Sequence, residues 1–89
     1  MGSIKDFKKE INYIFGEVID EAFFKKLIKP EVEDAKIEAI VDEAVDAYDN
    51  FKDKINQGKK AEDKKSFFKT LNKEYEDTVN ALLDKIKKL

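Results

Sequence analysis

The chain contains no histidine, cysteine, arginine or tryptophan, and all 18 of its basic residues are lysines. These missing residue types most often ligate transition metals, transfer protons near neutral pH, attack electrophiles or grip phosphates with paired hydrogen bonds. No glycine-rich loop or nucleophile elbow takes their place. We therefore expect a protein that is not an enzyme and that uses no cofactor and no bound metal.

Proline, glycine and long apolar runs are also scarce. One proline and three glycines leave few positions at which a regular element must stop. No run of about 18 apolar residues occurs, so we expect no segment to span a membrane. The start lacks the apolar core and small-residue cleavage site of a secretion signal, and Asp6 stands where a myristoylation motif needs serine or threonine. These features predict a cytoplasmic protein.

Charged residues make up 43% of the chain and hydrophobic residues 42%. This hydrophobic share is too high for a disordered polar chain, and so many charges are typical of slender helical bundles with a large surface. The lysine-rich stretch 52–73 is interrupted by Asp53, Glu62 and Asp63, and the net charge of the chain is −2. The stretch also contains no arginine, the residue best suited to paired hydrogen bonds with bases. We predict no nucleic-acid binding.

Hydrophobic residues recur at spacings of three and four throughout, which is the pattern of helices buried on one face. A first helix is predicted over residues 4–28, capped by Ser3 and ended by Pro30. A second is predicted over 30–57, with Pro30 in its first position and Gly58 as its stop. A third is predicted over 63–88, with Asp63 as its cap.

Short connections make consecutive helices antiparallel. The sequence therefore predicts an all-α fold, an up-down-up antiparallel three-helix bundle that forms a single domain over residues 1–89. The pattern is equally compatible with either handedness of the bundle. Gly16 interrupts the first helix, and is either simply tolerated there or permits a kink or a close backbone approach.

Four carboxylates follow one face of the second helix at intervals of four: Asp34, Glu38, Asp42 and Asp46. One interpretation is a solvated face partly balanced by Lys65, Lys69 and Lys73 on the antiparallel third helix. The others are a docking surface for a basic partner and a site for a divalent cation or another ligand, since carboxylate oxygens suit Ca²⁺ and Mg²⁺. Neither an EF-hand loop nor any histidine supports the cation site.

The first helix has more apolar residues than its buried stripe needs: Tyr13, Phe23, Phe24 and Leu27 lie off that stripe. Either the core drifts around the helix to include them, or they form an exposed patch. Such patches mark sites of partner binding or self-association. We therefore predict a small non-catalytic protein-interaction or structural module acting through these residues, with cation or ligand binding by the acidic face as the alternative.

The segment Ser3–Tyr13, which reads SIKDFKKEINY, resembles the opening of small uncharacterised helical proteins of Bacteroidetes. The resemblance is concentrated in the first helix. It implies a helical fold and a bacterial source, and it carries over no functional residue. A lysine-only set of basic residues is also consistent with an AT-rich genome.

Overall fold

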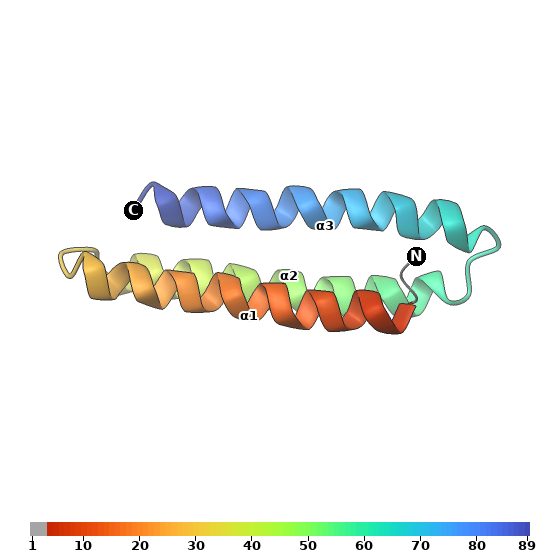
Figure 1. Ribbon diagram of the computed structural model, residues 1–89, viewed down its shortest axis with the longest axis horizontal. Coiled ribbons are helices and arrows are strands. Elements are labelled where there is room, and N and C mark those ends of the chain that lie inside the picture. The colour runs from red at the N-terminus through yellow and green to blue at the C-terminus, as the bar shows by residue number, and fades with distance from the viewer. Residues whose placement is uncertain (1–3) are drawn as a thin grey trace.

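The computed structural model describes residues 4–89 and contains three long α-helices (Figure 1). They are α1 (Ile4–Ile28), α2 (Asp34–Gly58) and α3 (Lys64–Lys87). The observed bounds of α1 and α3 lie within one residue of those predicted from the sequence. The predicted cap Ser3 lies outside the described residues.

The prediction that the second helix begins at Pro30 is wrong, because α2 begins at Asp34 after a turn. In this turn the Val32 N–H donates to the Lys29 carbonyl at 3.0 Å. The Val32 side chain is buried in the core. This burial keeps the backbone around Val32 in a turn, so the helix begins only after it. The Lys26 ammonium donates to the carbonyls of Pro30 and Val32, and so satisfies backbone groups that a helix would have paired.

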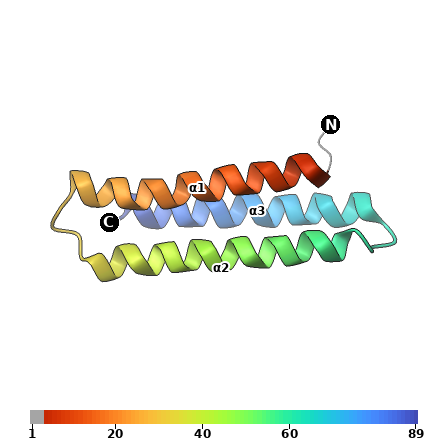
Figure 2. The ribbon, with the colours of Figure 1, turned by 90° about the horizontal axis from the view of Figure 1, so that it is seen from below.

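The predicted all-α, up-down-up three-helix bundle is confirmed. α3 packs against both α1 and α2, and the molecule measures 50 × 21 × 16 Å (Figures 1 and 2). Two ion pairs mark the antiparallel register of α2 and α3: Lys85 with Glu43 at 2.6 Å and Lys54 with Glu74 at 2.9 Å.

The core runs the length of the bundle and takes residues from every helix. At its middle, the rings of Phe15, Phe51 and Tyr75 stand 5.9–6.2 Å apart, one from each helix. Offset and edge-on arrangements at this spacing are favourable for aromatic rings. The buried apolar residues are Ile11, Phe15, Val18, Ala22, Val32, Ile37, Ile40, Ala44, Phe51, Ile55, Leu71, Tyr75, Leu82 and Ile86.

Two residues shape the connection between α2 and α3. Gly58 is the last residue of α2, and its φ is not positive, so it does not act as a left-handed helix stop. A Cβ at Gly58 would lie 2.6 Å from the Phe67 ring and 2.8 Å from the Phe68 ring. Glycine therefore permits the close approach of α2 to the start of α3. Asp63 caps α3 as predicted, accepting a 3.1 Å bond from the Ser66 N–H.

Candidate functional site

The four predicted contact residues of α1 are exposed. The exposed fractions are 67% for Tyr13, 53% for Phe23, 53% for Phe24 and 76% for Leu27. The interpretation in which the core drifts around α1 to cover them is therefore wrong. The buried stripe stays on the opposite side of the helix, at Ile11, Phe15, Val18 and Ala22.

These residues belong to a regular line along the outer face of α1. Residues 13, 16, 20, 23 and 27 alternate at spacings of three and four, so they share one side of the helix. We call this line the outer seam; its members are Tyr13, Gly16, Asp20, Phe23 and Leu27. All five are exposed.

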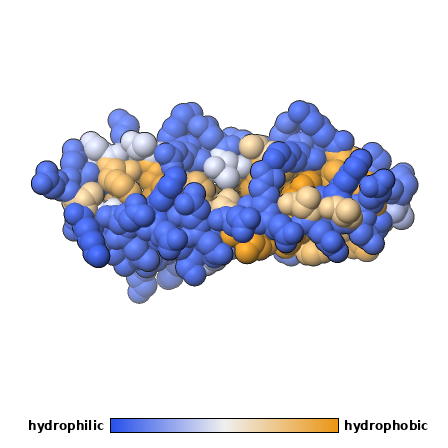
Figure 3. All heavy atoms as spheres, turned by 180° about the vertical axis from the view of Figure 1, so that it is seen from behind, coloured by the Kyte–Doolittle hydropathy of each residue, from blue (hydrophilic) through white to orange (hydrophobic). Residues whose placement is uncertain are grey.

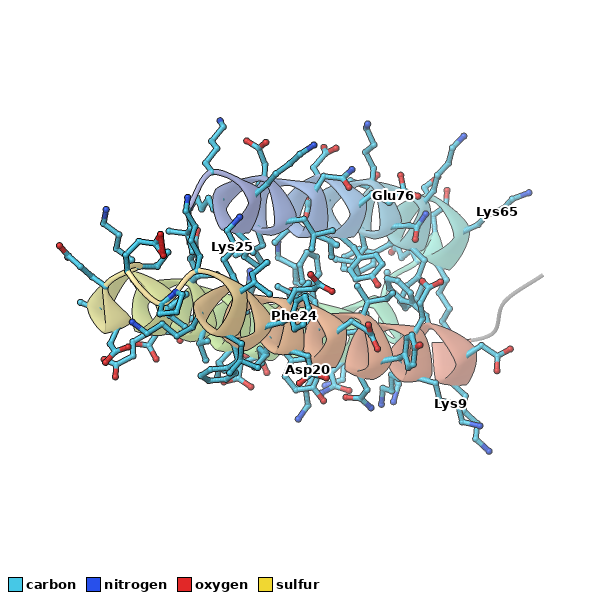
Figure 4. The ribbon with its side chains drawn as sticks, turned by 60° about the vertical axis from the view of Figure 1, so that its left-hand side comes forward. Lys9, Asp20, Phe24, Lys25, Lys65 and Glu76 are labelled. Atoms are coloured by element: carbon cyan, nitrogen blue, oxygen red, sulfur yellow. The ribbon has the colours of Figure 1, made fainter. Side chains whose placement is uncertain are left out.

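Phe24 lies beside the outer seam, toward α3. It lines a shallow groove of about 240 Å³ with Ile28 of α1 and with Leu83 and Ile86 of α3. Ile28 and Leu83 are themselves exposed, and neither was among the contact residues predicted from the sequence. Figure 4 marks Phe24, together with Asp20 of the outer seam, on α1. The apolar surface of α1 thus continues onto the last turns of α3.

The polar residues along the outer seam are mainly acidic, whereas Lys25 and Lys87 line the groove beside Phe24. Residues 10–24 of α1 include four carboxylates and no lysine. Three of these carboxylates, Glu17, Asp20 and Glu21, are exposed beside the aromatic rings. None of the three takes part in an ion pair within the described part of the chain. The outer face of α1 therefore combines apolar contact area with unneutralised negative charge.

The acidic face of α2 is also exposed, but the lysines predicted to balance it lie elsewhere. The antiparallel register places Lys65, Lys69 and Lys73 beside the C-terminal end of α2, whereas Asp34, Glu38, Asp42 and Asp46 occupy its N-terminal half. Lys73 instead pairs with Asp77 on its own helix at 3.5 Å. The predicted balance between these two rows is therefore wrong.

The charges near the acidic face are met by other residues. Lys26 lies 3.1 Å from Asp34, and Lys85 pairs with Glu43. Figure 3 shows the side on which α2 lies in front, where hydrophilic atoms cover most of the surface and apolar atoms appear between them in separate groups. Among residues 4–89, no three carboxylates are grouped so as to hold a metal ion. The geometry therefore adds nothing in favour of the cation-site interpretation.

A second groove, of about 450 Å³, lies between the end of α2 and the start of α3. Its charged residues already have partners. Lys54 pairs with Glu74, and the Asp63 carboxylate caps α3, where the hydrogen bonds from Ser66 hold its pKa below the usual range. The acids and the lysine that line this groove are thus engaged in an ion pair and a helix cap.

Tyr75 is the one buried side chain in the described residues whose polar atom has no hydrogen-bond partner. Burial, followed by the nearby charges of Glu10 and Glu76, raises its pKa to about 12. Its ring packs edge-on against Phe7 and Phe51 inside the core. The hydroxyl is enclosed by the bundle, so the raised pKa is a consequence of packing in the core.

Comparison of the chain with protein-family models, with curated proteins and with solved structures finds no match. The resemblance of residues 3–13 to proteins of Bacteroidetes therefore remains a prediction. Within residues 4–89, no helix has the length and apolar character needed to cross a bilayer.

Proposed function

We propose that this protein is a small, non-catalytic interaction module that acts in the cytoplasm and binds another protein chain through the outer face of α1. The observation that carries the proposal is the exposure of Tyr13, Phe23, Phe24 and Leu27 on one helix. Isolated apolar side chains are normal on protein surfaces, whereas a group of large ones marks a contact site. Aromatic residues are also the residues on which binding energy concentrates.

The energy available from covering this face is substantial for a bundle of this size. Complete burial of a large apolar side chain is worth roughly 1.5–3 kcal/mol. Each of the four side chains retains half or more of its exposed area, so each has on the order of 1 kcal/mol to gain from a partner. The free-energy costs of association and of ordering side chains reduce the summed gain. The expected complex is therefore of moderate affinity.

Truncation at Phe24 tests the proposal. Phe24→Ala removes an exposed ring and should leave the melting temperature nearly unchanged while weakening association. Val45→Ala is the matched control, because Val45 is an exposed apolar residue on α2. Association is measured in two ways: light scattering over a hundredfold concentration range for self-association, and quantitative capture from a bacterial extract for other proteins.

The proposal predicts a complex that the wild type and Val45→Ala form and that Phe24→Ala loses. A Phe24→Ala protein that is fully folded and associates as the wild type does would show that this ring is not a contact. If neither self-association nor specific capture occurs with any variant, the interaction function itself is wrong.

A further inference from the structure

We infer that the chain docked on the outer seam is a helix from another protein, with an apolar stripe flanked by lysine or arginine, and not a second copy of this chain. This inference rests on the proposed function and names the partner of the same face. It combines the spacing of the outer seam, the position of Gly16, and the charges beside the seam.

The spacing of the outer seam suits a helical partner. Alternation of three and four residues is the pattern by which two helices pack side chains into each other's gaps. From Tyr13 to Leu27 the seam extends roughly 21 Å at 1.5 Å per residue. This length matches about four turns of a partner helix packed alongside α1.

Gly16 supplies a gap in the seam that the fold itself does not need. A Cβ added there would meet nothing within 4 Å, and the residue has no positive φ. Glycine in the middle of a helix costs about 1 kcal/mol relative to alanine. A partner helix that crosses at Gly16, between Tyr13 and Asp20, would use this gap for close approach.

The charges select the partner. Glu17, Asp20 and Glu21 are exposed beside the aromatic surface, whereas Lys25 and Lys26 are only partly exposed and Lys9 lies one turn before Tyr13. Lys26 is bound to Asp34 and to the turn after α1, and Lys25 lines the groove toward α3. A basic helix would therefore meet unneutralised carboxylates along the seam, and charge complementarity of this kind directs the choice of partner.

The same charges disfavour a second copy. Asp20 stands at the midpoint of the outer seam, so antiparallel pairing of two α1 helices about the centre of the seam sets Asp20 against its own copy. Parallel pairing in register sets every carboxylate opposite the same carboxylate of the other copy. Like charges placed directly opposite each other are destabilising. Antiparallel pairing about Gly16 avoids this contact but sets Phe23 opposite the exposed Lys9, so the apolar side chains of the two copies do not meet.

Three synthetic helical peptides test the inference with the intact protein. They share one apolar stripe at spacings of three and four, and their flanking positions are all lysine, all glutamine or all glutamate. Binding is followed by fluorescence anisotropy at two salt concentrations, and light scattering records the mass of the protein alone. We expect the lysine peptide to bind at least about tenfold more tightly than the glutamate peptide, with the difference falling as salt rises.

Two variants of this chain check the mechanism. Asp20→Lys combined with Glu17→Lys should reverse the order of the lysine and glutamate peptides. Gly16→Gln should keep or raise the melting temperature, because nothing in the fold fills that space, and yet weaken the lysine peptide about tenfold or more. Glu38→Lys on α2 is the control for a nonspecific charge effect and should leave the order unchanged.

The remaining outcomes separate this inference from the proposed function. Equal binding of all three peptides, or no peptide binding, overturns the basic-helix partner, while the Phe24→Ala comparison still decides the interaction function. A wild-type dimer that persists at micromolar concentration and is lost in Gly16→Gln overturns it in favour of a second copy. If the Gly16→Gln variant loses binding because it is unfolded, as circular dichroism would show, the inference is also overturned, because the fold itself then needs the gap at Gly16.

Discussion

Gly58→Ala should destabilise this protein although alanine is the better helix former. The perturbation adds one methyl group at the last residue of α2. That methyl group would lie 2.6 Å from two atoms of the Phe67 ring and 2.8 Å from the Phe68 ring. Contacts this short require the rings to move by about 1 Å before they reach an ordinary van der Waals distance.

The magnitude follows from two opposing contributions. Replacing glycine by alanine in a helix gains about 1 kcal/mol at an interior position and less at a helix end. Forcing an extra methyl group into a packed site costs about 1–3 kcal/mol. The cost should prevail at Gly58, giving a net loss of about 1 kcal/mol, which for a domain of this size lowers the melting temperature by roughly 4–8 °C.

Gly16→Ala is the matched control, because the same chemical change meets nothing within 4 Å there. It should raise the free energy of unfolding by about 0.5–1 kcal/mol. Urea unfolding of the wild type and both variants, followed by circular dichroism, measures the difference. Equal stabilisation of both variants would refute the close approach of α2 to Phe67 and Phe68, since helix propensity alone would then account for both results.

Substitutions at three further positions test the core and the cap. Phe15→Ala should lower the free energy of unfolding by about 3–5 kcal/mol, and a loss under 1 kcal/mol in urea would mean that Phe15 is not central. Tyr75→Phe removes a buried hydroxyl without a partner and should raise stability by about 1 kcal/mol. Because the folded pKa of Tyr75, about 12, exceeds its unfolded value of about 10, wild-type stability should fall relative to Tyr75→Phe as pH rises through that window, and parallel profiles would contradict this. Asp63→Ala should lower the melting temperature at pH 7, whereas Asp63→Ser should preserve it. Because Ser66 depresses the pKa of Asp63, the difference in melting temperature between the wild type and Asp63→Ala should shrink as the pH is lowered through that pKa.

The helices and their order were predictable because each carries a strong period of three to four residues and the breaks between them are short. Where tertiary packing decided between local options, the sequence was insufficient. Pro30 suits both the first position of a helix and a turn, and burial of Val32 selected the turn. Likewise Phe15 became the central ring because it faces Phe51 and Tyr75 on two other helices, which the pattern of a single helix does not show.

The candidate site was only partly predictable for the same reason. A helical projection separates Tyr13 and Leu27 from the buried stripe, but it does not show whether a coiling core will reach them. That depends on how far α3 covers α1, and the structure leaves this face open. The neutralising role assigned to Lys65, Lys69 and Lys73 failed because periodicity within a helix carries no information about the register between helices.

The up-down-up order of the bundle has a consequence for how quickly it forms. α1 packs on α2 and α2 on α3, each after a short connection, whereas α1 and α3 are separated along the chain by the whole of α2. Chains dominated by such local contacts lose little entropy in loop closure and fold within microseconds to milliseconds. A molecule that unfolds should therefore refold before its core aromatic rings associate with those of another unfolded molecule.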